Sequence, residues 1–160
     1  MPLPDPLAFT IQPDDLTGQP TRALIARHLA GMHSSSPPAS VHALSVEKLR
    51  QPDVLFWSAW AGAEIAGCAA LKRIDATRGE IKSMRVADQY LGKGVGRLLL
   101  NHILSEARRL QLFTLWLETG STPDFLPALK LYKSAGFTRC GPFDGYVEDA
   151  FSVFMMRVLD

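Results

Sequence analysis

The stretch Ile81–Leu100, which reads IKSMRVADQYLGKGVGRLLL, decides the fold of this chain. Its first residues are typical of a buried strand, a short polar loop follows, and an amphipathic helix begins among three alternating glycines. Gly92, Gly94 and Gly96 allow backbone conformations that a side chain forbids, and they let the main chain approach a ligand closely. The first N–H groups of a helix lack partners, and the helix dipole adds positive charge there. The pattern therefore predicts a site for an anion such as a pyrophosphate.

The composition is that of one ordinary domain. A chain of 160 residues can bury about two thirds of the surface that it exposes when unfolded. Its 17 Lys and Arg residues and 16 Asp and Glu residues leave a net charge of +1, which favours neither a nucleic acid nor an anionic membrane as partner. Cys68 and Cys140 lack the spacing of a metal site, and residues 1–15 lack the pattern of a secretion signal. The two cysteines also lack the density of a disulfide scaffold, so we expect a protein of the reducing cytoplasm. No apolar run approaches the roughly 20 residues that span a bilayer.

Hydrophobic periodicity predicts strands and helices in a mixed order. Strands are expected at 7–12, 54–61, 64–74, 79–86, 113–118, 137–140 and 152–159, and helices at 21–32, 45–49, 93–110 and 127–134. The strand, helix and strand between 80 and 118 imply a parallel pair within an otherwise antiparallel sheet. The expected fold is a single α/β (α+β) domain over residues 1–160, with a mixed sheet of about six or seven strands flanked by about four helices.

Two other kinds of phosphate site fit the glycines less well. A P-loop needs Gly-x-x-x-x-Gly-Lys-Ser/Thr, which Gly92-Lys93-Gly94 does not supply. A dinucleotide fold is closer, since strand, glycines, helix, strand and the acidic Glu118 mimic its first unit. Three features argue against a dinucleotide fold: the loop at 87–91, the G-x-G-x-G spacing and the antiparallel strands that come before.

Two motifs resemble one known family. Residues 86–96, VADQYLGKGVG, resemble the acetyl-CoA signature Gln/Arg-x-x-Gly-x-Gly/Ala of the GNAT (GCN5-related) N-acetyltransferases. Residues 131–137, LYKSAGF, resemble the Leu-Tyr-x-x-x-Gly-Phe that follows later in that family, and the likeness extends over most of the chain. The resemblance implies transfer of acetyl from acetyl-CoA to a primary amine of a small-molecule or amino-acid-like acceptor, by direct attack in a ternary complex and without a metal.

The resemblance leaves alternatives open. The chain could be a non-catalytic acetyl-CoA sensor that binds a partner protein, or an acetyltransferase of protein N-termini or lysines. A nucleotide-binding module is the alternative from another class. A homodimer through the C-terminal strands is also common in the family.

The resemblance also implies which residues bind the cofactor. They are Met84, Arg85, Val86, Leu91, Gly92, Lys93, Gly94, Val95, Gly96, Arg97 and Tyr132. Two positions depart from the family pattern. Leu91 stands where Arg or Gln is usual, which removes a side chain but keeps the backbone amide. Phe125 stands where Asn is common, so Thr119 or Ser121 would have to supply that hydrogen bond.

Acetyl transfer to an amine needs a base, because an alkyl ammonium with a pKa near 10.4 must lose a proton before it attacks. Glu80 opens the strand that leads into the glycine loop, and it resembles the catalytic glutamate of the histone acetyltransferase branch. Glu118 closes the adjacent parallel strand and is the competing candidate. Tyr132 is the expected general acid for the departing thiolate, and a backbone N–H near Met84 or Arg85 is expected to hold the oxyanion.

The acceptor is expected to contact segments 32–42 and 141–149, which shape the acceptor pocket in the family. Residues of both charge signs could meet it: Arg73, Lys82 and Arg85 for a carboxylate, and Asp144, Glu148 and Asp149 for an amine. His28, His33 and His42 lack the spacing of a metal site. His28 is expected to be structural, whereas His33 and His42 could touch the acceptor.

Overall fold

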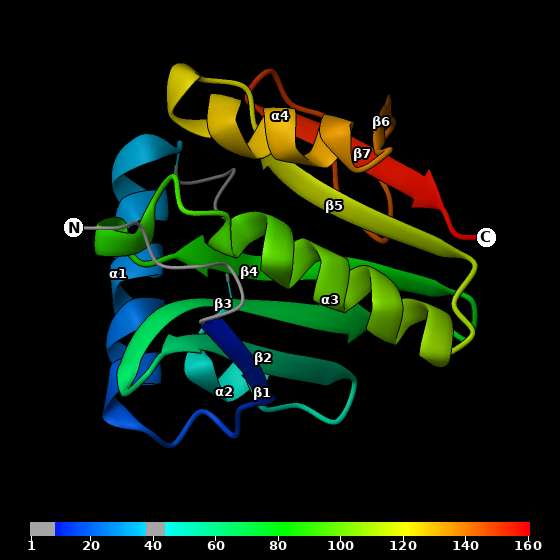
Figure 1. Cartoon of the computed structure of the whole chain (residues 1–160). Coiled ribbons are helices and arrows are strands. Elements are labelled where there is room, and N and C mark those ends of the chain that lie inside the picture. Colours follow the sequence, from blue (N-terminus) through cyan, green and yellow to red (C-terminus); the bar gives the residue numbers. More distant parts are fainter. Residues whose placement is uncertain (1–8, 38–43) are drawn as a thin grey trace.

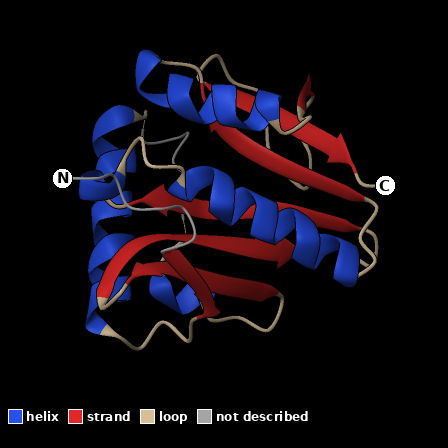
Figure 2. Cartoon of the chain, viewed as in Figure 1, coloured by secondary structure: helices blue, strands red, loops and turns tan. Residues whose placement is uncertain are grey.

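A computed structural model describes residues 9–37 and 44–160 as one sheet with helices on both faces (Figures 1 and 2). The seven strands stand in the order β1-β2-β3-β4-β5-β7-β6. They are β1 (Phe9–Pro13), β2 (Val54–Ala61), β3 (Glu64–Arg73), β4 (Arg78–Val86), β5 (Thr114–Gly120), β6 (Thr138–Cys140) and β7 (Ser152–Val158). The helices are α1 (Gln19–Ser35), α2 (Val46–Leu49), α3 (Val95–Arg109) and α4 (Leu126–Ser134). The expected fold class is confirmed.

The strands β4 and β5 are the parallel pair that the sequence predicts, and the other neighbouring strands in the described residues are antiparallel. The pair is joined only over residues 78–80 and 114–116, and beyond Glu80 the two strands diverge (Figure 1). In β4 the register with β3 also shifts, and Ser83 adopts a φ of 53°, which residues with a side chain rarely take. The sheet therefore opens between β4 and β5.

The two faces of the sheet carry separate cores. On one face α3 and α4 bury Leu99, Ile103 and Leu129 against the sheet, and on the other face α1 and α2 bury Ile25 and Leu49. Alternate residues of β3 serve the two cores because successive side chains of a strand point to opposite faces. The opening between β4 and β5 thus has α3 and α4 on one face of the sheet and α1 and α2 on the other.

The element boundaries differ from the expected ones by a few residues. Helix α1 begins at Gln19, with Pro20 in its first turn where its missing N–H costs nothing, and it ends at Ser35. Helix α3 begins at Val95 because Gly94 before it is left-handed, with a φ of 84°. The first two residues of the strand expected at 7–12 lie outside the described residues. Where the structure is described, no helix has the length and hydropathy of a membrane span.

The three glycines of the signature have different roles. Gly92 and Gly94 have positive φ, as expected, with open space where a Cβ would stand. Gly96 has an ordinary helical backbone, and its expected role in an unusual conformation is wrong. A Cβ at this position would lie 3.2 Å from Leu131 Cδ2 on α4, so Gly96 instead allows close packing of the two helices.

Candidate functional site

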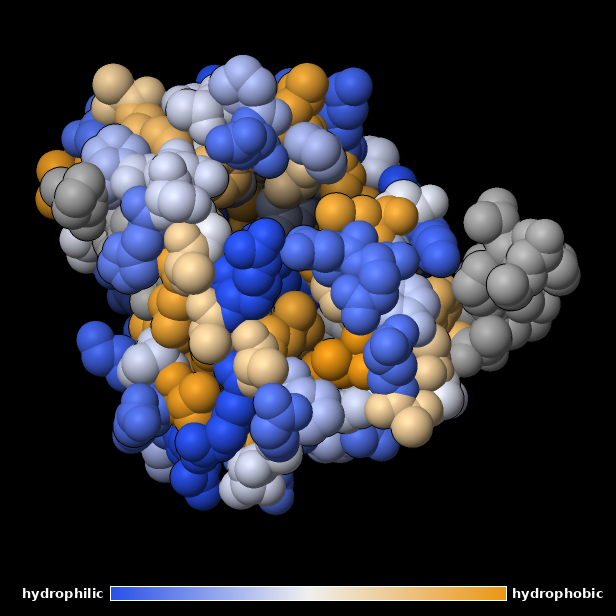
Figure 3. All heavy atoms as spheres, turned by 90° about the vertical axis from the view of Figure 1, so that its left-hand side faces the viewer, coloured by the Kyte–Doolittle hydropathy of each residue, from blue (hydrophilic) through white to orange (hydrophobic). Residues whose placement is uncertain are grey.

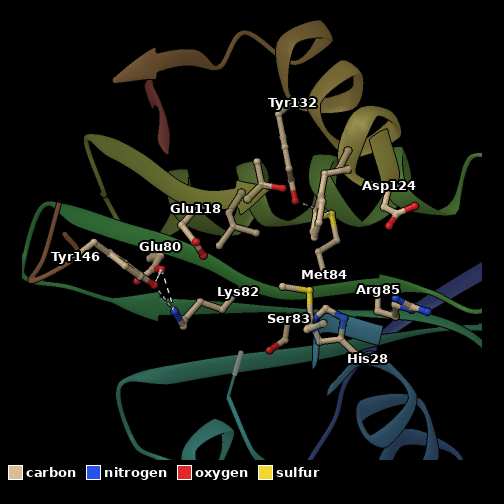
Figure 4. Close-up of a pocket in the computed structure, with 15 residues that line it drawn as sticks. His28, Glu80, Lys82, Ser83, Met84, Arg85, Glu118, Asp124, Tyr132 and Tyr146 are labelled. Atoms are coloured by element: carbon tan, nitrogen blue, oxygen red, sulfur yellow. Dashed lines mark hydrogen bonds and ion pairs between the residues drawn. The ribbon is translucent and has the colours of Figure 1, made fainter. Parts of the chain in front are cut away.

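A cavity of about 220 Å³ lies where β4 and β5 diverge (Figure 4). Its floor comes from the two strands, and its walls come from α1, α4 and the segment between β6 and β7. The residues that line it are His28, Met32, Glu80, Ile81, Lys82, Ser83, Met84, Arg85, Glu118, Thr119, Asp124, Phe125, Ala128, Tyr132 and Tyr146. Seen from the side where α3 begins, the surface is hollowed near its middle, with polar and apolar residues around the opening (Figure 3).

A second cavity, of about 470 Å³, adjoins the first at the start of α3. The two share five lining residues: Met84, Arg85, Asp124, Ala128 and Tyr132. Most of the residues expected to bind the cofactor line this second cavity, namely Met84, Arg85, Val86, Leu91, Gly92, Gly94, Val95, Gly96 and Tyr132. Lys93 and Arg97 do not line it. The Lys93 ammonium lies 5.4 Å from the centre of the Tyr90 ring, and Arg97 donates to Ser134 Oγ at 2.6 Å.

The second cavity has backbone features that could hold a pyrophosphate. Gly92 and Gly94 turn the backbone just before α3, and no atom lies within 4 Å of the place where a Cβ would stand on either residue. Close approach of a ligand to this main chain is therefore unobstructed. The N–H groups of the first turn of α3 begin here and favour an anion. Leu91, at the position that departs from the signature, is 62% exposed and leaves the backbone of the loop accessible.

Tyr132 stands at the junction of the two cavities. Its ring comes from α4 and is buried, and its hydroxyl lies 3.8 Å from Met84 Sδ (Figure 4). Burial raises the pKa of Tyr132 to about 12, so the phenol is protonated at neutral pH. It can donate a hydrogen bond or a proton to a group that lies between the cavities.

Glu80, Lys82 and Tyr146 form a closed cluster in the first cavity (Figure 4). The Lys82 ammonium lies 3.0 Å from Glu80 Oε2 and 2.6 Å from the Tyr146 hydroxyl, which in turn donates to Glu80 Oε2 at 2.5 Å. The Glu80 side chain is only 2% exposed and that of Lys82 only 9%. Burial and the neighbouring carboxylate hold the pKa of Tyr146 far above its usual value, so this phenol stays protonated.

Sequence reasoning missed Tyr146. The segment 141–149 was expected at the acceptor, but only its charges were considered. Phe143 anchors this segment: its ring centroid lies 5.3 Å from that of Trp116 and 6.0 Å from that of Phe154. This packing places Tyr146 over β4. The aromatic pair within GPFDGYVED was the available signal, because aromatic side chains in a polar loop commonly pack onto the sheet beneath.

Glu118 also reaches the first cavity. It belongs to β5, and its Oε2 accepts a hydrogen bond from Ser152 Oγ at 2.8 Å. In Figure 4 its carboxyl group points into the space between Glu80 and Tyr132. The structure thus brings both carboxylates that compete for the role of base into the same cavity.

Two further polar atoms of this cavity lack a hydrogen-bond partner in the described part of the chain. The Nδ1 atom of His28 and the Oγ atom of Ser83 are buried and have no hydrogen-bond partner among the described residues. Burial, with a contribution from Arg85, lowers the pKa of His28 to about 4, so its imidazole is neutral near pH 7. Unpartnered buried polar atoms are rare in folded proteins, so each of these two calls for an explanation such as a bound water or ligand.

Several predicted residues do not line the first cavity. Arg73, Asp144, Glu148, Asp149 and His33 are absent from its lining. Asp149 instead accepts hydrogen bonds from the backbone N–H groups of Phe151 and Ser152, at the start of β7. His42 and part of the segment 32–42 lie outside the described residues.

Phe125 fills the place of the family's Asn with an apolar contact. Its ring centroid lies 5.4 Å from that of Phe151. Of the two residues that could replace the missing hydrogen bond, Thr119 lines the first cavity, whereas Ser121 Oγ donates to the Ala150 carbonyl at 3.3 Å. Among the described residues, no group of three or more His, Cys, Asp or Glu is placed to hold a metal ion.

Comparison with known proteins identifies the family of the chain. The model of the Acetyltransferase (GNAT) family matches residues 23–137. YsnE of Bacillus subtilis, an uncharacterised N-acetyltransferase, is 52% identical over 149 residues, which cover 93% of this chain and 99% of that protein. YedL of Escherichia coli, another uncharacterised N-acetyltransferase, is 48% identical over 151 residues, with coverages of 94% and 95%.

A solved structure from Klebsiella pneumoniae subsp. pneumoniae, provisionally named an acyl-CoA N-acyltransferase, superimposes with a TM-score of 0.77 at 27% identity. The match covers 95% of this chain and 98% of that one. The fold and the signature loop lead to the same family as the sequence relatives. The chain belongs to the GNAT family of acetyltransferases.

Proposed function

We propose that this protein transfers the acetyl group of acetyl-CoA to a primary amine of a small-molecule acceptor, by direct attack in a ternary complex. The observation that carries the proposal is the pair of adjoining cavities, which meet at Met84 and Tyr132. One has the backbone features of a pyrophosphate site, and the other holds Glu80 and Glu118. A thioester bound from one side would meet an amine bound from the other.

Each step of the reaction has a candidate group in this arrangement. Glu80 or Glu118 takes a proton from the acceptor ammonium, directly or through water, and the neutral amine attacks the thioester carbon. A backbone N–H near Met84 holds the oxyanion. As the C–S bond breaks, Tyr132 passes a proton to the sulfur, and the proton that the attacking nitrogen loses restores the phenol, directly or through water. Burial raises the pKa of the phenol, and it also raises the pKa of a thiol that leaves into the same cavity. The two pKa values therefore stay similar, and the phenol can still protonate the thiolate.

Direct transfer is favoured over an acetyl-cysteine intermediate. Cys68 is fully buried, and burial raises the pKa of its thiol to about 12, so a nucleophilic thiolate does not form at neutral pH. Cys140 lines neither cavity. No described cysteine is thus placed to carry the acetyl group.

The size of the first cavity supports a small acceptor. Its volume of about 220 Å³ is below the roughly 300–1,000 Å³ of pockets that enclose drug-sized ligands. The segment that carries Tyr146 also closes over it. An acetyltransferase of protein N-termini or lysines would need a groove that admits a peptide.

Release of free CoA from acetyl-CoA with a panel of amines tests the function. Tyr132→Phe should lower kcat by about 10²-fold or more, the usual contribution of a positioned acid, and leave acetyl-CoA affinity nearly unchanged. An unchanged kcat would remove Tyr132 from the mechanism. Tight binding of acetyl-CoA without CoA release for any amine would support the sensor instead, and preference for NAD in calorimetry would support the nucleotide-binding module.

The pH dependence of the rate identifies the base. Of Glu80→Gln and Glu118→Gln, the variant that removes the base should lose the acidic limb of the kcat/KM profile. If Glu80→Gln keeps this limb and Glu118→Gln loses it, the assignment moves to Glu118. If both variants keep the acidic limb, water is the proton acceptor.

A further inference from the structure

Lys82 is a buried cation in the wall of the first cavity. Its side chain is 9% exposed, and a buried ammonium is costly unless its protons are hydrogen-bonded. Two of its three N–H groups have partners, Glu80 Oε2 and the Tyr146 hydroxyl. No partner for the third is found among the described residues. A donor is therefore held in a fixed place on the cavity wall.

The cluster fixes the direction of this donor. Tyr146 accepts from Lys82 and donates to Glu80, so the three groups close a ring of hydrogen bonds. Lys82 cannot turn without breaking two of them. An ammonium held in this way does not have to be ordered when a ligand binds, which increases the affinity for an anion that fits.

Other cationic groups are less suited to hold an acceptor anion. Arg85 lines the cavity, but its Nη2 lies 3.6 Å from Asp88 Oδ1, and its guanidinium packs beside Gly31 on α1. Arg73 does not line the cavity. Next to Lys82 along β4 stands Ser83, whose buried hydroxyl has no partner among the described residues and can add a neutral hydrogen bond.

We propose that the Lys82 ammonium, oriented by Glu80 and Tyr146, binds the carboxylate of an α-amino-acid-like acceptor. The inference rests on the proposed function and narrows it. In an α-amino acid the amine and the carboxylate are attached to the same carbon atom, so a carboxylate on Lys82 places the amine among Glu80, Glu118 and Tyr132, which line the same cavity. The zwitterion itself brings no net charge into a cavity that already holds the Glu80–Lys82 pair and the Glu118 carboxyl group.

Matched acceptors test this inference. L-amino acids are compared with their primary carboxamides and with the corresponding decarboxylated amines, and CoA release is measured. A hydrogen bond to a charged group contributes about 1.5–3 kcal/mol, so the acids should have a kcat/KM at least about tenfold higher than the carboxamides. Equal use of acids and carboxamides would overturn the inference and leave the acetyltransferase function standing.

Two variants then test whether Lys82 causes the preference for acids over carboxamides. Lys82→Met should abolish it, and Lys48→Met, on the exposed face of α2, is the matched control that should keep it. Because Lys82→Met leaves Glu80 buried without its cation, the double variant Glu80→Gln/Lys82→Met provides a second test in which no buried charge is left. Circular dichroism confirms that each variant is folded. A preference that survives in both Lys82 variants would refute the assignment.

A binding measurement separates this inference from the proposed function. Calorimetry with the same acids and carboxamides, in the presence of CoA, does not require turnover. If no probe causes CoA release, yet acids bind preferentially and the double variant loses that preference, the carboxylate site stands and the proposed function fails. If acids show no advantage in binding or in turnover, the inference is wrong.

Discussion

Replacing Lys82 with Met is expected to reveal how strongly the Glu80–Lys82–Tyr146 cluster is coupled. The substitution keeps an unbranched side chain, shorter by its terminal atom, but removes the ammonium that lies 3.0 Å from Glu80 Oε2. Glu80 is then left as a carboxylate that is 2% exposed, with the Tyr146 hydroxyl still donating to it. The folded state therefore carries a buried charge with only half of its hydrogen bonds from the cluster.

The expected loss follows from this geometry. Removing one partner of a buried ion pair typically costs about 3–5 kcal/mol. Because Tyr146 still stabilises the carboxylate, we expect the lower end, about 3 kcal/mol. A domain of this kind is stable by only about 5–15 kcal/mol, so the change is a large fraction of the total. Glu80→Gln should also be destabilising, since it leaves the Lys82 ammonium buried without a counter-charge.

Urea unfolding followed by circular dichroism measures the free energy of unfolding for the wild type, both single variants and the double variant. In Glu80→Gln/Lys82→Met neither charge remains, so its loss should be smaller than the sum of the two single losses by about 2 kcal/mol or more. The m-values should stay unchanged. Single losses that add to within about 0.5 kcal/mol would show that the two groups are not coupled, and would refute this account of the cluster.

Three further outcomes are expected. Burial lowers the pKa of His28 to about 4, so between pH 6.5 and about 4 the unfolded chain binds a proton that the folded chain does not. On going from about pH 8 to about pH 5, this proton uptake should lower the free energy of unfolding of the wild type by about 2 kcal/mol. His28→Gln should lack this part of the loss, and urea unfolding at the two pH values checks it. Gly120→Ala places a Cβ 2.5 Å from Phe125 Cδ2 and should cost about 1–3 kcal/mol in thermal unfolding, whereas Gly141→Ala, with nothing within 4 Å, should not. Leu91→Arg should bind acetyl-CoA about fivefold more tightly at low salt by calorimetry, and a gain that persists at high salt would contradict a charge effect.

Much of the fold was predictable because local patterns agreed with the tertiary structure. The apolar runs of β2 and β3, the turn between them and the buried stripe of α3 each indicate their element without reference to the rest of the chain. The parallel pair followed from the strand, helix and strand order. The exact start of α3 could not be predicted, because the three alternating glycines do not show which of them directly precedes the helix, and the structure shows that it is Gly94.

The site was predictable where backbone chemistry forms it and less so where distant side chains meet. Gly92 and Gly94 could be recognised from their own sequence pattern. The cluster of Lys82 with Tyr146 could not, because 64 positions separate the two residues and no local spacing relates them. Their contact depends on Phe143, which packs against Trp116 and so brings its segment over β4.

The sequence by itself determined the family and predicted an anion-binding loop, because glycines before an amphipathic helix act through the local backbone. The sequence also indicated that Glu80 and Glu118 lie on adjacent parallel strands, but the opening of a cavity between them was decided only by the tertiary structure, since it requires β4 and β5 to diverge beyond Glu80. The same holds for the Lys82 cluster. Contacts between side chains distant in sequence arise only when the sheet and its covering segments are assembled, and the IKSMRVADQYLGKGVGRLLL stretch supplies just one side of them.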